Sequence, residues 1–162
     1  MTVNVRVGQG FDIHPWSDDP HRPLVLGGVT VPGERGLAGH SDADVVAHAV
    51  ADALLGAAGL PDLGTLFPAA DPHYENADSM ILLADVAGRL KGAGYRVGNV
   101  DVVIVAEQPR LAAAVGEMAD NLQRVVGGSV SVKPKRGEGL GAIGRAEGIA
   151  AMAVALLEPI ER

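Results

Sequence analysis

With 162 residues, 48% of them hydrophobic, the chain is long enough for one domain with a sizeable core, and residues 1–162 are predicted to form that single domain. It contains no cysteine, which excludes disulfides, thiolate zinc sites and cysteine nucleophiles, so a transition metal would need His, Asp or Glu ligands. The net charge of −7 argues against nucleic acid as a partner, and the lack of a long apolar run or an N-terminal leader favours a cytoplasmic protein that does not bind a membrane.

Strands over residues 2–8 and 24–31, a helix with apolar positions from Val45 that ends by residues 56–59, and a long loop over 62–76 are predicted for the first half of the chain. Apolar and polar side chains alternate in the first segment, as they do in a half-buried strand. The second strand (LVLGGVTV) is expected to contain a bulge at its paired glycines. Ser41 or Asp42 is expected to cap the helix, because both side chains can accept hydrogen bonds from free backbone N–H groups. A loop as long as the fourth segment is uncommon in a compact domain unless it has a function.

The second half is predicted to continue this alternation, with a helix from residues 76–78 to 92–94, a strand over 98–106, a helix over 110–126, a strand over 129–133 and a final helix over 145–157. The last helix follows from the spacing of its apolar residues Ile149, Met152, Ala153 and Leu156. Strands that alternate with helices imply a single layered domain of the α/β (α+β) class.

A carboxylate and an imidazole follow the first predicted strand, in residues 10–14 (GFDIH). Asp12 and His14 are two positions apart, so in an extended chain their side chains project from the same face. With His48 of the first predicted helix they would supply three ligands and leave a fourth position open, which is typical of a catalytic zinc site. The alternative is structural: Asp12 and His14 form a turn before Pro15, and His48 makes an ordinary hydrogen bond on its helix.

The first predicted helix carries further polar residues around this imidazole. Asp44 and Asp52 lie one helical turn on either side of His48, so all three are expected to share a face. His40 and Ser41 stand where the helix begins, and there free backbone N–H groups and the helix dipole favour an anion such as phosphate.

Basic residues and glycines are concentrated in residues 132–145 (VKPKRGEGLGAIGR). The cationic side chains are those of Lys133, Lys135, Arg136 and Arg145. Cations and bare backbone amides ahead of a helix suit a diphosphate, and Glu138 among them could hold a Mg²⁺ ion that bridges phosphate oxygens. The alternative interpretation is a mobile, solvated loop.

Taken together, these segments resemble the 2-C-methyl-D-erythritol 2,4-cyclodiphosphate synthase family of the non-mevalonate isoprenoid pathway. The resemblance spans nearly the whole chain in the same order and is carried by GQGFDIH (8–14), GHSDADVVAHAVADALLGAAGLPDLGTLFP (39–68), DPHYENADS (71–79), GNVDVVIVAEQPRL (98–111) and GLGAIGRAEGIA (139–150). An HSDxDxxxH segment coupled to an upstream DxH is specific for this family.

The resemblance implies a fold, a reaction and a set of cofactors. The expected fold is an α/β domain with a mixed sheet and helices packed mainly on one face, and it assembles as a homotrimer with active sites between neighbouring subunits. The substrate would be 4-diphosphocytidyl-2-C-methyl-D-erythritol 2-phosphate, whose 2-phosphate attacks the β-phosphorus, closes a cyclic diphosphate and expels CMP. Each subunit would hold one Zn²⁺ on Asp12, His14 and His48, and Glu138 would bind a Mg²⁺ or Mn²⁺ ion with the diphosphate.

The family motifs also imply substrate-binding positions in this chain. These are Asp12, His14, His40, Ser41, Lys135, Arg136, Glu138 and Arg145 around the phosphates, Asp62, Leu63 and Gly64 at the erythritol portion, Asp71 on the next segment, and Ala106, Pro109, Arg110 and Leu111 at the cytidine. Among them, His40 and Arg136 are the expected catalytic residues.

The chain departs from the family pattern in two places. PKRGE (134–138) stands where members usually carry a Thr-rich segment close to ATTTE, so Arg136 replaces a hydroxyl at the diphosphate and Gly137 replaces its neighbour. Ala69 stands where a substrate-facing carboxylate is common. A guanidinium can replace the hydroxyl as a stronger phosphate donor, or it can block the pocket. Two alternatives stay open: a catalytically altered relative that binds a nucleotide or isoprenoid diphosphate, and a zinc hydrolase of simple phosphoesters.

Overall fold

The structure, a computed structural model, describes residues 4–161, so residues 2 and 3 of the first predicted strand and the outermost residues of the predicted domain lie outside it. A four-stranded sheet with strand order β1-β6-β4-β5 forms its centre. Its strands are β1 (Arg6–Pro15), β6 (Gly148–Pro159), β4 (Tyr95–Val105) and β5 (Ser129–Lys135). β6 pairs antiparallel with β1 and with β4, whereas β5 pairs parallel with β4, which confirms the predicted mixed sheet.

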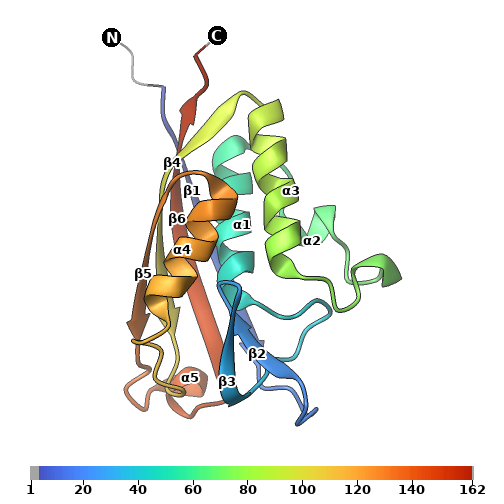
Figure 1. The fold of residues 1–162 in the computed structure, drawn as a ribbon, viewed down its shortest axis with the longest axis vertical. Coiled ribbons are helices and arrows are strands. Elements are labelled where there is room, and N and C mark those ends of the chain that lie inside the picture. The colour runs from blue at the N-terminus through green and yellow to red at the C-terminus, as the bar shows by residue number, and fades with distance from the viewer. Residues whose placement is uncertain (1–3, 162) are drawn as a thin grey trace.

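Three helices, α1 (Val45–Ala58), α3 (Ser79–Gly92) and α4 (Val115–Val126), cover one face of this sheet, as Figure 1 shows. α1 packs on β1 and β6, α4 packs on β5, and α3 contacts both of these helices. This arrangement confirms a mixed α/β domain whose helices lie on one side. None of the helices in the described part of the chain is long and apolar enough to cross a membrane.

The face of β1 that meets α1 carries glycines rather than apolar side chains. Gly8 and Gly10 lie so close to the helix that a Cβ atom on Gly10 would stand 1.8 Å from the carbonyl oxygen of Ala49. The apolar residues of β1 point the other way, and Val7 and Phe11 are 65% and 54% exposed. A strand does form here, but it runs from Arg6 to Pro15 rather than over residues 2–8, and its apolar face is not the one that the helices bury.

The predicted final helix over residues 145–157 is wrong, because this segment forms β6. Almost every residue in it is apolar, so its pattern fits a helix and a fully paired strand equally well. In the strand, Ala151, Ala153 and Ala155 are buried, whereas Met152 and Val154 are 38% and 48% exposed on the opposite face. Pairing with β1 on one side and β4 on the other decides the outcome, since tertiary context overrides local propensity.

Residues 24–31 form a hairpin rather than one strand with a bulge. β2 (Pro23–Leu26) and β3 (Val29–Arg35) pair antiparallel around a two-residue turn. Gly27 and Gly28 occupy the turn with φ of 55° and 71°, values that favour glycine and suit the tightest hairpin turns.

The cap of α1 is Asp44, not Ser41 or Asp42 as predicted. Its buried carboxylate accepts hydrogen bonds from the backbone N–H groups of Val46 and Ala47 at 3.1 and 3.0 Å. The same carboxylate accepts from both glycines of the hairpin turn at 2.8 Å each. One side chain thus starts the helix and fixes the hairpin against it.

Two other predicted segments differ in detail. α4 begins at Val115 rather than at residue 110, and the predicted loop over residues 62–76 contains two short helices. The short helices in the structure are α2 (Leu63–Leu66), η1 (Pro72–Tyr74) and α5 (Gly141–Gly144).

Candidate metal site and its surroundings

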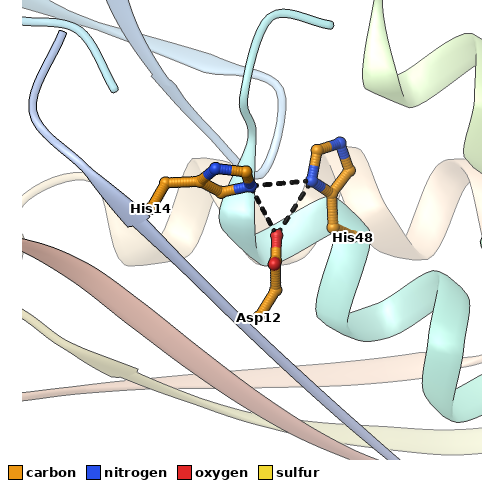
Figure 2. A group of neighbouring side chains, drawn as sticks. All are labelled: Asp12, His14 and His48. Atoms are coloured by element: carbon orange, nitrogen blue, oxygen red, sulfur yellow. Dashed lines mark hydrogen bonds and ion pairs between the residues drawn. The ribbon is translucent and has the colours of Figure 1, made fainter. Parts of the chain in front are cut away.

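Asp12 and His14 of β1 and His48 of α1 converge on one point, as Figure 2 shows. Asp12 Oδ2 lies 2.8 Å from His14 Nε2 and 2.9 Å from His48 Nδ1, and these two nitrogens are 3.4 Å apart. Ligand atoms of a tetrahedral zinc ion stand roughly 3.3 Å apart, because zinc lies about 2.0–2.1 Å from each N or O ligand. The three predicted ligands therefore need shifts of only about half an ångström to share one ion.

The site depends on how closely β1 meets α1. Alternation along the strand puts Gly8, Gly10, Asp12 and His14 on the side that faces the helix. The two glycines let the helix backbone rest on the strand backbone, and the next two side chains on that side then reach His48. The spacing of small and polar residues on β1 thus builds the site.

Electrostatics make this point attractive to a cation. Burial opposes the charge on Asp12, but hydrogen bonds from His14 and His48 outweigh it and hold the pKa of Asp12 well below its usual value. Burial also opposes a charge on His48, yet its hydrogen bond to Asp12 and the nearby carboxylates raise the pKa of His48 above its usual value. An ionised carboxylate and two imidazole nitrogens are the donor set that Zn²⁺ prefers in a protein without cysteine, so these residues fit that ion.

A cavity of about 270 Å³ opens beside the three ligands. Its wall includes the predicted residues His40, Ser41, Leu63 and Gly64 and also Ala69, the position of one departure from the family pattern. Sequence reasoning missed Asp52, Phe67, Tyr74 and Leu82 as wall residues. The spacing of four residues after His48 had placed Asp52 on the same helix face without assigning it to a cavity, whereas the other three come from loops and a helix that only the tertiary fold brings near.

Asp52 and Asp44 were expected to share a face with His48, and in the structure the two carboxylates have different roles. Asp44 is fully buried in its capping role and is not among the residues that line the cavity. Asp52 lines the cavity and accepts a hydrogen bond from the Leu63 N–H at 2.8 Å. Burial raises the pKa of Asp52, and the charges of Asp62 and Asp12 add to that rise.

The expected anion site at the start of α1 is not supported. The first free N–H groups of the helix already donate to Asp44, so they do not face a ligand. Asp62 and Asp71, predicted to contact the substrate, are exposed and cap the short helices α2 and η1 by accepting from Thr65 and His73. Both carboxylates thus have a local structural role, and Asp71 is not part of the cavity wall.

A second cavity, of about 350 Å³, lies where β4 and β5 end. It is lined by the residues that the family resemblance implies for the cytidine and by two of the basic residues: Ala106, Pro109, Arg110, Leu111, Lys135 and Arg136. Arg136 donates a hydrogen bond to Glu107 Oε1 at 2.5 Å, and this contact holds the pKa of Glu107 below its usual value. Arg136, which stands where family members usually have a hydroxyl, is thus held at this cavity by a carboxylate of the same chain.

Two of the other three basic residues of the segment are also paired with carboxylates. Lys133 pairs with Asp101 at 2.5 Å, and Arg145 pairs with Glu147 at 2.6 Å. Glu138 is exposed and is not part of the group that Asp12 forms with the two histidines. A second ion at Glu138 would therefore need most of its ligands from outside this group.

Fold and site together define an α/β protein with an open set of metal ligands at the mouth of a cavity, an arrangement used for metal-assisted chemistry. The sequence profile of the YgbB family matches residues 5–158. A protein of Moorella thermoacetica named 2-C-methyl-D-erythritol 2,4-cyclodiphosphate synthase is 53% identical over 156 residues, 94% of each chain. A protein of the same name from Enterococcus faecalis is 48% identical and is covered over 99% of its length. The chain belongs to the YgbB family.

Solved structures agree with this assignment. IspF of Plasmodium falciparum in a CDP complex superposes with a TM-score of 0.84 at 33% identity, over 99% of this chain and 100% of that one. The bifunctional IspDF of Campylobacter jejuni gives a TM-score of 0.93 at 36% identity, and this chain spans 44% of that protein. The predicted family and the mixed α/β fold are confirmed.

Proposed function

We propose that this chain converts 4-diphosphocytidyl-2-C-methyl-D-erythritol 2-phosphate to 2-C-methyl-D-erythritol 2,4-cyclodiphosphate with release of CMP, as a phosphorus–oxygen lyase of isoprenoid biosynthesis. The observation that carries the proposal is the convergence of Asp12, His14 and His48 beside a cavity, in a chain about half identical to synthases of that name over nearly its full length. A 2-phosphate oxygen bonds to the β-phosphorus, the bond from that phosphorus to the bridging oxygen breaks, and CMP leaves with that oxygen.

Asp12, His14 and His48 are proposed to hold one Zn²⁺. When bound, this ion would polarise phosphate oxygens and neutralise charge that develops on them. Glu138 is proposed to hold a Mg²⁺ or Mn²⁺ ion together with the diphosphate of the substrate. The side chains then have mainly to position the reacting phosphates and to neutralise their negative charge, as is usual in phosphoryl transfer.

Substrate contacts divide between the two cavities. His40 and Ser41 line the first cavity beside the metal ligands, so they are proposed to orient the reacting phosphate, and Leu63 and Gly64 of the same wall to contact the erythritol portion. The second cavity is proposed to take the cytidine, with Arg136 at its rim directed toward the diphosphate. Lys135 and Arg145 are proposed as further cationic contacts of the phosphates.

The two cavities support a site shared between copies of the chain. β1 and β5 form opposite edges of the sheet, three strand spacings or roughly 14 Å apart, so one subunit keeps its metal ligands away from its own cytidine cavity. The exposed apolar residues of β1 and β6 offer a surface for a neighbouring subunit. We therefore propose a homotrimer with active sites between subunits, and a cytoplasmic location stays a prediction.

The test is a reaction of the purified protein with the proposed substrate, Zn²⁺ and Mg²⁺. We expect release of CMP, seen by chromatography, together with a cyclic diphosphate in the phosphorus NMR spectrum. Binding of the substrate without CMP would contradict the proposal and favour a binding protein, and a linear product would indicate a hydrolase. His48→Ala is expected to stay folded and to lose bound zinc, measured by elemental analysis.

A further inference from the structure

The nitrogen of His48 that faces away from the ligand cluster meets two buried hydroxyl groups. His48 Nε2 lies 2.9 Å from Ser79 Oγ and 3.1 Å from Ser41 Oγ. Ser79 is the first residue of α3 and is 1% exposed, and Ser41 is 8% exposed. The ring is therefore held between Asp12 on one nitrogen and serine hydroxyls on the other.

The hydroxyl group of Ser79 donates its proton to a third residue, Asp42. Ser79 Oγ donates to Asp42 Oδ1, while Asp42 Oδ2 accepts from the backbone N–H of Ser79 at 3.1 Å. A carboxylate only accepts hydrogen bonds, so the hydroxyl must be the donor in this contact. The oxygen of Ser79 consequently faces His48 Nε2 with a lone pair and can only accept from it.

This chain of donors sets the tautomer of the histidine. Because Ser79 accepts, Nε2 of His48 carries a proton. In the metal-free protein Nδ1 donates to Asp12, and a bound ion takes the place of that second proton, so the neutral imidazole that ligates the ion presents the lone pair of Nδ1. Nδ1 is the nitrogen that lies 2.9 Å from Asp12 Oδ2 and 3.4 Å from His14 Nε2. The hydroxyl thus points the one atom of His48 that can bind a metal at the other two ligands.

Asp42 itself is anchored by backbone contacts from two helices. It accepts from the N–H of Ser79, where α3 begins, and its Oδ1 accepts from the N–H of Asp44, the cap of α1, at 3.1 Å. Its own N–H donates to Ala77 O at 3.0 Å. The carboxylate is therefore part of the joint between the two helices and has little freedom to turn away from Ser79.

We propose that Ser79 and Asp42 are positioning residues of the metal site: through the Asp42–Ser79–His48 hydrogen bonds they fix the ring orientation and the Nε2–H tautomer that leave His48 Nδ1 free for the ion. The inference rests on the proposed metal binding by Asp12, His14 and His48. Outer partners of this kind orient ligating histidines in metal sites generally, and their removal costs 10- to 100-fold in metal affinity or activity.

The test is the affinity of the purified full chain for Co²⁺, followed by visible absorption, and for Zn²⁺, followed by competition with a chelator. We expect Ser79→Ala to bind both ions about 10- to 100-fold more weakly, with a changed Co²⁺ spectrum and an unchanged circular dichroism spectrum. Asp42→Asn keeps an acceptor oxygen but loses the charge, so its loss should be smaller. Ser131→Ala is the matched control, because it removes an exposed serine that donates to Asp101 at 2.7 Å, and it should bind like the parent.

Each outcome decides one part of the inference. Affinity of Ser79→Ala within about twofold of the parent would overturn the positioning role, and parental affinity of Asp42→Asn would remove Asp42 from it. If Ser79→Ala does not fold, the isosteric variants Ser79→Thr and Ser79→Val decide: the hydroxyl should rescue affinity and the methyl should not, and equal affinities would overturn the role. Absence of Co²⁺ binding by the parent would instead contradict the proposed metal site itself.

Discussion

Replacing Gly10 with alanine tests whether the contact between β1 and α1 sets the geometry of the metal ligands. The added Cβ would stand 1.8 Å from Ala49 O and 2.7 Å from Ala53 N, both of the helix backbone. Side-chain carbons essentially never come within 3.0 Å of such atoms, so strand and helix must separate by about 1.2 Å or more. No flexible side chain stands between them to absorb the shift.

Two losses follow, one in stability and one in metal affinity. Overpacking of a tight contact costs about 1–3 kcal/mol, which in a chain of this size lowers the melting temperature by roughly 2–12 °C. His48 moves with α1, and a shift of about 1 Å exceeds the roughly 0.2 Å tolerance of metal–ligand distances. We therefore expect Gly10→Ala to bind Zn²⁺ at least about tenfold more weakly than the parent.

The assay combines thermal unfolding of the metal-free protein with chelator competition for Zn²⁺. Gly88→Ala is the control, because a Cβ on Gly88, within α3, meets nothing within 4 Å. That variant should keep the parental affinity and gain up to about 1 kcal/mol, as alanine does over glycine in a helix. Parental melting temperature and parental affinity in Gly10→Ala would refute the idea that the backbone contact sets the site.

Three further predictions concern the cap of α1, the second cavity and the outer face of the sheet. Asp44→Ala leaves four backbone N–H donors without their acceptor and should lower the unfolding free energy, measured by urea titration, by about 3 kcal/mol or more. A loss under about 1 kcal/mol would contradict the double role of this carboxylate. Arg136→Gln should raise the pKa of Glu107 toward its usual value, seen by carbon-13 NMR. Because the folded-state pKa is the lowered one, the pair stabilises the parent above the unfolded pKa and loses this effect as pH falls through the folded pKa. The variant should show less of that pH dependence, and an unchanged pKa would mean that Arg136 does not control Glu107. Met152→Lys puts a charge on the exposed apolar face and should reduce the particle mass in light scattering without unfolding the chain, whereas an unchanged mass would show that assembly does not use this face.

The fold was predictable where the pattern of side chains admits one solution. α1 and α3 have capping residues, apolar stripes and terminal glycines, and both lie close to their predicted positions. β6 was not predictable from its own residues, because a nearly uniform apolar run carries no periodicity. Its state depends on β1 and β4, which flank it in space and lie far away in sequence.

The ligands of the candidate metal site could be predicted because His is rare in this chain and because the DxH and HSDxDxxxH segments together resemble one family, whereas their spacing alone left a structural alternative open. Ser79 and Tyr74 could not, since a serine at a helix start and a tyrosine in a loop have ordinary local explanations. Ser79 approaches His48 because α3 packs against α1, and Tyr74 reaches the cavity from η1, in the segment before α3. Nor does the sequence reveal that Arg136 has a carboxylate partner, because Glu107 lies 29 positions away.

The bare contact between Gly10 and α1 has a consequence for any attempt to move this site into another protein. Where side chains separate a strand from a helix, repacking can change their distance, and grafted ligands drift with it. Here the distance between β1 and α1 is set by contact of main-chain atoms, so substitutions elsewhere in the core are expected to leave it unchanged. A transplant of this site should therefore include β1, α1 and the two glycines between them. Three ligand residues placed on another scaffold would not keep the spacing that metal binding needs.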